Sequence, residues 1–357
     1  MKHINTYILE KLKISKPNKV VKHTLFPKSR AELVDIIKYQ TKMNGNECSL
    51  NHIDVSNIEN MAYVFNNANK KFNGDISQWD VSKVKDMSAM FMETHFNGDI
   101  SDWDVSNVEE MSWMFQDSKF NGDISDWDVS NVTDMAFMFN NSSFTGDISL
   151  WDVSSVIYMD YMFAMCEFDG DLSKWNVSNV QSMESLFELC NYTGKNGDIN
   201  NWDVTKVKNM NKLFSSSKYD GDLSKWNVSN VTKATNMFAC GDYTGKNGDL
   251  SKWNTKKIRY MNGMFHASKY EGDLSNWDVS KVKTMEIMFS YNKVFNGDLS
   301  KWNVSNVNNM ISMFKNSNYN NDLSSWQIND NCYSRNMFYY CPIESKYKPF
   351  KDDERIN

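Results

Sequence analysis

Tryptophan recurs along this chain at a nearly constant spacing, and that period constrains the fold more than any other feature of the sequence. Eleven of the 12 tryptophans lie 24 to 27 residues apart, from Trp79 to Trp326. Ten Gly-Asp pairs keep the same phase, and a final unit has Asn321-Asp322 in their place. A fixed period of this length is typical of a repeat protein, in which each unit packs against its neighbours.

Each unit follows the consensus F-N-G-D-I-S-x-W-D-V-S-N-V-x-x-M-x-x-M-F, which contains two hydrophobic patterns. The first has the L-x-x-L-x-L spacing of a leucine-rich repeat and predicts a short strand. One example is Ile100, Trp103 and Val105. The second has apolar residues at i, i+3, i+6 and i+7, which predicts one face of a short helix with Ser106 at its N-cap. One example is Val108, Met111, Met114 and Phe115.

The Gly-Asp pair between these patterns predicts a turn. Glycine adopts a positive φ without strain, so we expect that conformation at the glycine of each pair. The aspartate that follows can accept hydrogen bonds from nearby backbone amides. We therefore interpret the recurring aspartate as structural.

A single coil buries too few apolar side chains to offset the entropy of ordering it, so the coils must stack. We predict an α/β solenoid, a leucine-rich-repeat-like right-handed superhelix of about 11 coils. A parallel sheet would cover one face, short helices the other, and a helical cap the N-terminal end. The tryptophan, methionine and phenylalanine side chains would form ladders inside it.

The motif W-D-V-S-N-V-x-x-M-x-x-M-F resembles the BspA-type leucine-rich repeats, including the repeats of mycoplasma surface lipoproteins. The resemblance covers about residues 51–340. It implies a leucine-rich-repeat-like fold used for adhesion or protein recognition, commonly on bacterial surfaces, and it transfers no catalytic residue. Residues 1–30 contain no apolar stretch typical of a secretory signal. We therefore expect the cytoplasm or a phage particle rather than classical surface display.

The pattern divides the chain into four segments. We predict a basic amphipathic leader or arm over 1–26, an N-terminal cap with an incomplete first repeat over 27–65, the solenoid over 66–340 and a polar tail over 341–357. Ser29 and Glu32 have capping-box spacing and predict a cap helix over 27–44. Pro342 and Pro349 would stop further coils.

The leader is strongly basic, since residues 1–30 carry eight Lys or Arg and one Glu. Four apolar residues line one side of a possible helix within it: Ile4, Tyr7, Ile8 and Leu12. The segment resembles short leaders of bacteriophage proteins that are directed to an assembling particle. It could therefore dock the protein to a particle, pack along the acidic solenoid or bind a membrane surface.

No catalytic constellation is visible in the sequence. The five histidines share no metal-ligand spacing, and the six cysteines form no C-x-x-C pair. Two Tyr-Thr-Gly-Lys-Asn-Gly-Asp insertions lack the phosphate-loop pattern and predict turn extensions. Cys166 and Cys190 should be stacked neighbours that stay reduced. We expect no enzyme activity, cofactor or metal centre.

Composition bears on two classes of partner. The formal net charge of -6 argues against a nucleic-acid binder, which needs a basic surface. No apolar run approaches the about 18 residues of a membrane span, so a membrane partner is disfavoured and only surface binding by the leader stays open. A protein or glycan partner remains.

The binding site is predicted from residues outside the consensus. If the second apolar pattern is helical, the fifth residue after its first valine faces away from the core. Three consecutive units carry aromatic residues there, Trp113, Phe137 and Tyr161, and Tyr158 lies beside them. Exposed aromatic patches mark partner sites. The alternatives are a column covered by the leader and an inert surface.

A second surface follows the tryptophans, where four units carry aspartate: Asp80, Asp104, Asp128 and Asp152. Stacked carboxylates repel one another unless something neutralises them. Hydrogen bonds from the recurring serines, a cationic partner segment and a loosely held calcium ion are the alternatives. The leading hypothesis is a recognition or adhesion scaffold that binds through the solenoid surface. The alternative is a bacteriophage-encoded structural or particle-associated protein docked through its leader.

Overall fold

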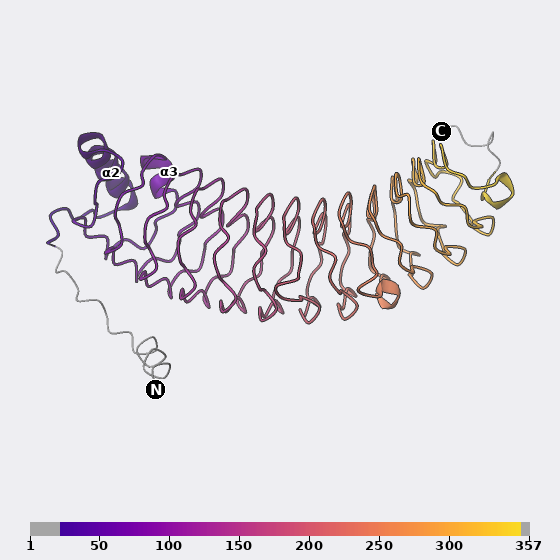
Figure 1. Ribbon diagram of the computed structural model, residues 1–357, viewed down its shortest axis with the longest axis horizontal. Helices are drawn as coiled ribbons and strands as arrows, with labels where there is room; N and C mark the ends of the chain where they lie inside the picture. The colour runs from indigo at the N-terminus through magenta and orange to yellow at the C-terminus, as the bar shows by residue number, and fades with distance from the viewer. Residues whose placement is uncertain (1–21, 351–357) are drawn as a thin grey trace.

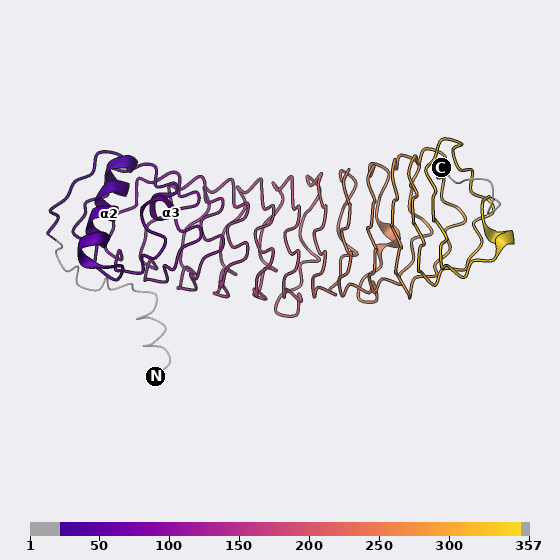
Figure 2. The same ribbon diagram turned by 90° about the horizontal axis from the view of Figure 1, so that it is seen from above.

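The computed structural model describes residues 22–350, and residues 1–21 and 351–357 lie outside this description. The backbone winds into a row of similar coils stacked side by side, so this part of the molecule is elongated (Figures 1 and 2). The row bows gently, with the N-terminal coils at one end and the C-terminal coils at the other (Figure 1). The prediction of a repeat protein is confirmed, whereas most of the predicted leader lies outside the described residues.

The interior consists of aromatic and methionine ladders, as the sequence predicts. The eleven repeat tryptophans are each only 3% or 4% exposed. The rings of Trp79 and Trp103 stack with centroids 6.4 Å apart. Two further columns run beside them, represented by Phe91 and Phe115 at 5.6 Å and by Phe96 and Phe120 at 6.2 Å.

The predicted short helices within the repeats are wrong. Two residues of every unit adopt the left-handed region, as Trp113 (φ 58°) and Asp117 (φ 53°) show. An α-helix needs consecutive right-handed residues, so these two positions interrupt it. The segment forms overlapping turns instead, and Ser106 bonds to Asp104 rather than capping a helix.

Hydrogen bonds between coils replace those of a helix. Backbone N–H groups of alternate residues donate to carbonyl groups of the next coil. The pairs in one unit are Met111 to Asp134, Trp113 to Ala136, Phe115 to Met138 and Asp117 to Asn140, at 2.9–3.0 Å. The coils are therefore joined continuously along this side.

The predicted strand is also misplaced. The segment from Ile100 to Val105 forms a turn, closed by the Trp103 N–H at 3.2 Å from the Ile100 carbonyl oxygen. Parallel pairing among residues 22–350 consists of isolated bridges, and apart from the bridge between Leu25 and Ile53 they lie where we expected a helix. The bridged positions from the first coil to the last are Asn60, Asp86, Glu110, Asp134, Tyr158, Ser182, Asn209, Lys233, Tyr260, Thr284, Asn309 and Tyr333.

The glycine of the Gly-Asp pair has a packing role. Glycines with a positive φ are Gly45, Gly194, Gly245 and Gly263, none of which belongs to a Gly-Asp pair, so that expectation is wrong. A Cβ atom at Gly98 would lie 2.7 Å from the Phe96 ring and 3.2 Å from the Gly74 carbonyl oxygen. Glycine is required there because the ring and the neighbouring coil leave no room for a side chain.

The predicted N-terminal cap helix is confirmed as α2, Arg30–Asn44. The Ser29 hydroxyl accepts the Glu32 N–H at 3.2 Å, and Glu32 accepts the Lys28 N–H at 2.8 Å. On the side of the bridges, the carbonyl groups of alternate residues accept N–H groups of the preceding coil, and Ala62 lies on this side of the incomplete first repeat. The Arg30 guanidinium donates to the Ala62 carbonyl oxygen at 3.2 Å and so caps part of this open edge.

The remaining elements are short. They are α3 at Val64–Ala68, η1 at Leu250–Lys252 and η2 at Ser345–Tyr347. Beyond Pro342, the chain packs on the last coil: Ile343 is buried, and the Leu323 N–H donates to the Tyr347 carbonyl oxygen at 2.9 Å. The predicted polar tail thus closes the C-terminal end as far as residue 350. Within residues 22–350, every helix is too short or too polar to cross a bilayer.

Candidate recognition surface

Three aromatic residues form a continuous stack on the outside of three successive coils. We call Trp113, Phe137 and Tyr161 the aromatic column. The rings of Trp113 and Phe137 lie 5.6 Å apart, and those of Phe137 and Tyr161 lie 4.5 Å apart, with planes 18° and 7° from parallel. The structure therefore brings together the three residues that the sequence singled out.

The aromatic column is half-buried rather than fully directed to solvent. Tyr158, on the coil of Tyr161, is 47% exposed. The equivalent positions before and after the column, Ala89 and Ser185, are fully buried, so the helical argument for exposure is wrong there. At this repeat position the uninterrupted run of aromatic residues is therefore limited to three coils, between Ala89 and Ser185.

The column residues adopt strained backbone conformations, with φ of 58° at Trp113, 61° at Phe137 and 58° at Tyr161. Bulky residues rarely occupy this left-handed region, whereas asparagine and glycine enter it easily. Asn236 and Gly263 hold the same position in other units. Ile287 and Lys212 also hold it, with φ of 51° and 54°, so the coil imposes this conformation whatever the side chain.

Four carboxylates lie along the same side of the coils. We call Glu110, Asp134, Asp160 and Glu184 the acidic border. Asp134 is bridged to Glu110 on one side and to Tyr158 on the other. The Tyr161 hydroxyl lies 3.5 Å from Glu184 Oε1, which places this carboxylate against the end of the aromatic column.

Burial raises the pKa values of three carboxylates of the acidic border, and repulsion adds to the shift at two of them. Burial raises the pKa of Glu110, and the charges of Asp134, Asp86 and Glu109 add to it. Burial also raises the pKa of Asp134. The pKa of Asp160 is raised by burial and by the charges of Glu184 and Asp134. The border therefore holds negative charge under strain.

Hydrogen bonds fix these carboxylates in place. Asp134 accepts the Ala136 N–H at 2.8 Å, and Asp160 accepts the Glu184 N–H at 2.7 Å and the Ser182 hydroxyl. No basic nitrogen of residues 22–350 forms an ion pair with the acidic border within 4 Å. Sequence reasoning missed the border because it assigned the bridged positions to a helix.

The aspartates that follow the tryptophans are exposed and bonded to serine. Each accepts the N–H of the serine two residues later, at 3.1 Å for Asp80, Asp104 and Asp128 and at 3.0 Å for Asp152. Hydrogen bonds from Ser130 lower the pKa of Asp128. Of the three alternatives for neutralising these aspartates, hydrogen bonds from serine are therefore the one that is observed. Within residues 22–350, no group of three or more His, Cys, Asp or Glu side chains could hold a metal ion.

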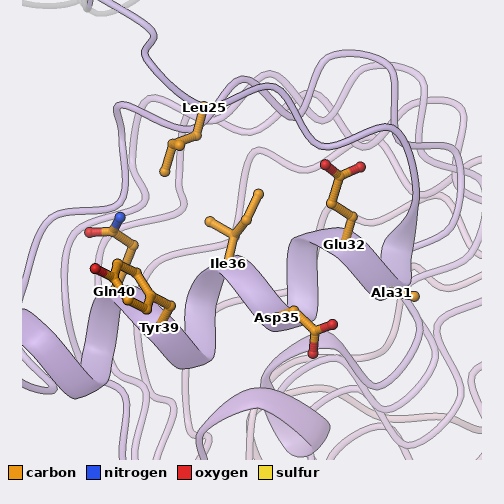
Figure 3. A pocket seen from close by; sticks show the side chains of 7 residues that line it. All are labelled: Leu25, Ala31, Glu32, Asp35, Ile36, Tyr39 and Gln40. Atoms are coloured by element: carbon orange, nitrogen blue, oxygen red, sulfur yellow. The ribbon is translucent and has the colours of Figure 1, made fainter.

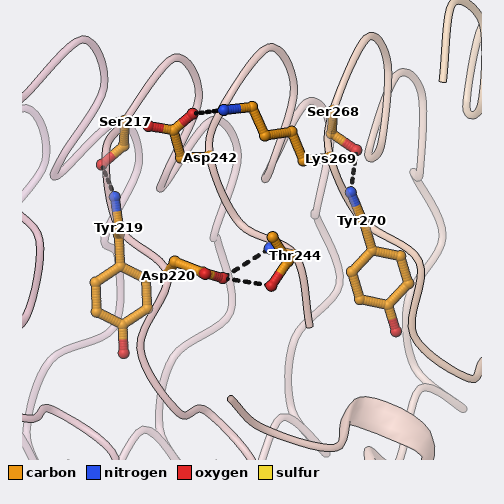
Figure 4. A network of polar contacts seen from close by, with 8 residues as sticks. All are labelled: Ser217, Tyr219, Asp220, Asp242, Thr244, Ser268, Lys269 and Tyr270. Atoms are coloured by element: carbon orange, nitrogen blue, oxygen red, sulfur yellow. Dashed lines mark hydrogen bonds and ion pairs between the residues drawn. The ribbon is translucent and has the colours of Figure 1, made fainter. Parts of the chain in front are cut away.

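The two insertions are turn extensions held by the preceding coil. In the second, Asp220 accepts both the N–H and the hydroxyl of Thr244 at 2.8 Å (Figure 4). Asp169 accepts the same two groups of Thr193 in the first. Lys269 also pairs with Asp242 at 2.6 Å (Figure 4). Because Asp169 and Asp220 hold the two insertions through these hydrogen bonds, the insertions have a structural role.

The cysteine prediction is confirmed in its geometry. Cys166 Sγ lies 3.4 Å from Cys190 Sγ in the next coil, and both thiols are free and buried. Burial and the contact with Cys166 raise the pKa of Cys190 well above its usual value. Such a thiol is poorly reactive.

A groove of about 520 Å³ lies beside α2, and sequence reasoning missed it (Figure 3). Ile36 and Tyr39 supply much of its apolar wall, and Leu25 faces them from the preceding segment. Glu32 and Asp35 stand at its edge (Figure 3). The sequence signal that could have revealed this groove is the second apolar side of the cap helix, which carries Ile36 and Tyr39.

Comparison with known proteins identifies the repeat family. One family, described as mycoplasma protein of unknown function, DUF285, matches residues 34–145, 118–192, 138–247 and 240–348. No curated protein and no solved structure matches the chain. Because the four overlapping matches extend over most of its length, the chain belongs to this DUF285 family.

Proposed function

We propose that this protein is a non-enzymatic recognition or adhesion scaffold that binds a protein or glycan partner through the aromatic column. One observation carries the proposal: three half-buried rings stack at 5.6 Å and 4.5 Å on adjacent coils beside the exposed Tyr158. Partner sites are rich in tryptophan and tyrosine because these rings bury a large area with little loss of side-chain entropy.

The rigid support of the column favours binding. Each column residue donates its backbone N–H to the following coil, at 2.9 Å for Trp113 and 2.8 Å for Phe137 and Tyr161. A partner would therefore meet rings that are already ordered. Preorganisation of this kind lowers the entropic cost of association.

The proposal includes the architecture of the scaffold. We infer that the coils form a right-handed, leucine-rich-repeat-like solenoid of the BspA type, with its isolated bridges serving as a minimal parallel sheet. The parallel sense of all the bridges supports this inference. A crystal structure would contradict it if consecutive coils wound in the opposite sense.

The test removes the aromatic column and keeps a matched control. The full chain would be applied to a glycan array and, as an immobilised bait, to candidate protein partners. We expect W113A/F137A/Y161A to weaken retained binding by about tenfold, or about 1.4 kcal/mol. The control L150A/M165A/Y291A removes apolar side chains that are 74%, 51% and 48% exposed elsewhere.

Circular dichroism would show that both variants keep the fold. Equal binding by the column variant and the wild-type chain would contradict the proposal. Equal loss in the control variant would also contradict it, because binding would then depend on general surface hydrophobicity.

A further inference from the structure

The acidic border gives the aromatic column a charge preference. We propose that the partner segment bound there is basic and extended, with Lys or Arg side chains lying against the column rings and the border carboxylates. This inference rests on the proposed function, because it names the chemistry of the partner that the column binds.

The first argument is the position of the carboxylates beside the rings. Glu110, Asp134 and Tyr158 are bridged in consecutive coils, and parallel neighbours of this kind lie about 4.8 Å apart. Glu184 lies 3.5 Å from the Tyr161 hydroxyl. Because the rings stack face to face, the column presents ring edges to solvent, and a basic side chain there would lay its aliphatic stem over the edges and bring its charged end toward Glu184.

The second argument is electrostatic. The carboxylates of the border repel one another and are partly removed from water, as the raised pKa values of Glu110 and Asp160 indicate. Within residues 22–350 no basic side chain pairs with them within 4 Å, and Lys212, which pairs with Glu188, also attracts Glu184 from a longer distance. A bound guanidinium or ammonium group would relieve this repulsion.

The third argument concerns the shape of the partner. Together the two ring spacings make a column about 10 Å long from Trp113 to Tyr161. Alternate side chains of an extended segment lie about 6.7 Å apart on one face. Two basic residues at i and i+2 therefore fit above the column, which predicts an Arg-x-Arg or Lys-x-Lys pattern.

The charge of the same side reverses beyond the acidic border. Lys208 and Lys233 are exposed at or beside the bridged positions of the next two coils, and Lys212 pairs with Glu188 at 3.2 Å. A basic segment would be repelled there, which limits it on the C-terminal side to the coil of Glu184. Charge thus sets both the position of the bound segment and its limit on that side.

The experiment measures binding of a fluorescein-labelled peptide of alternating Gly and Arg to the full chain by fluorescence anisotropy. We expect E110Q/D134N/E184Q to raise Kd by about tenfold. The control D104N/D128N/D152N removes the same charge from the exposed aspartate ladder and should change Kd by less than about twofold. W113A/F137A should weaken binding as well, whereas an alternating Gly-Glu peptide should not bind.

Three outcomes would overturn the inference. They are no binding of the arginine peptide, equal weakening in the control variant, and unchanged binding in the border variant. The competing occupant is this chain's own basic segment. A variant of the full chain would carry glutamine in place of five lysines of that segment: Lys2, Lys11, Lys13, Lys16 and Lys19. If the arginine peptide bound only to this variant, the segment would be the occupant, and the proposal of a separate partner would be overturned.

The proposed function can survive the failure of this inference. A glycan or protein whose binding is lost in W113A/F137A/Y161A but unaffected by E110Q/D134N/E184Q would support the aromatic column as a recognition site. It would also show that the partner is not selected by positive charge.

Discussion

The indole Nε1–H of Trp103 donates a hydrogen bond across 3.2 Å to the carbonyl oxygen of Ile76 in the preceding coil. Every repeat tryptophan makes the equivalent bond, at 2.8–3.2 Å. The same carbonyl oxygen also accepts the Trp79 N–H of its own coil at 3.1 Å, so the indole adds a second bond. Tryptophan therefore both fills the interior and joins one coil to the next.

Replacing a central tryptophan should therefore weaken the stack by more than its loss of volume. In Trp127→Phe, the Ile100 carbonyl oxygen loses the donor that lies 3.1 Å away. The Ile100 carbonyl oxygen keeps the Trp103 N–H as a donor at 3.2 Å, so we expect a loss of about 0.5–1.5 kcal/mol from the missing bond between coils, in addition to the cavity. Urea denaturation followed by circular dichroism measures the change.

The matched control is Trp113→Phe, which removes an indole from the aromatic column rather than from the interior. It should lower the free energy of unfolding by less than about 1 kcal/mol. Similar losses in the two variants would contradict a special role for the bond between coils.

The tryptophan stack could be predicted because it depends only on the period. The path of the backbone between tryptophans could not. Spacing of Val108, Met111, Met114 and Phe115 at i, i+3, i+6 and i+7 fits a helix, but successive turns with left-handed residues place the same side chains inward. The left-handed position carries Trp113 rather than glycine, so the sequence contains no turn signal there.

The candidate site was predictable to a similar extent. The aromatic column could be predicted because three consecutive units carry an aromatic residue at a position that the consensus leaves open. This prediction does not depend on the backbone conformation at that position. The acidic border requires the bridged register, which aligns Asp134 with Glu110 and Tyr158. The helical interpretation gave a different set of neighbours and therefore could not reveal the border.

A substitution at a Gly-Asp pair tests the packing role of its glycine. Gly98→Ala would place a Cβ atom 2.7 Å from the Phe96 ring. Overpacking of this kind should destabilise the protein by about 1–3 kcal/mol, measured by urea denaturation. The double variant F96L/G98A should recover part of that loss relative to F96L, since leucine leaves more room. A neutral Gly98→Ala would contradict the packing argument.

Thiol reactivity should separate the six cysteines. Cys240 is exposed, whereas Cys166 and Cys190 are buried and Cys190 has a raised pKa. We expect one fast reaction with a disulfide reagent in the native protein, and Cys240→Ser should abolish it. Cys166 and Cys190 should react only after unfolding. Fast labelling of either in the native chain would show that the coils open there.

The pH dependence of stability should reveal the strained charge of the acidic border. Burial and the charges of Glu184 and Asp134 raise the pKa of Asp160. Its folded pKa is therefore above the unfolded value of about 3.9. The folded state binds the proton more tightly, so the resulting stability is present below pH of about 4 and is lost as pH rises through the folded pKa.

Asp160→Asn should therefore raise the melting temperature at pH 7, and the difference from the wild-type chain should shrink toward pH 4. Asparagine Oδ1 can still accept the bonds from Ser182 and Glu184 that hold the carboxylate. Asp128→Asn is the control, because hydrogen bonds from Ser130 lower the Asp128 pKa and its effect should have the opposite sign. A destabilised Asp160→Asn at pH 7 would show that the bonds of the carboxylate outweigh its repulsion from Glu184 and Asp134.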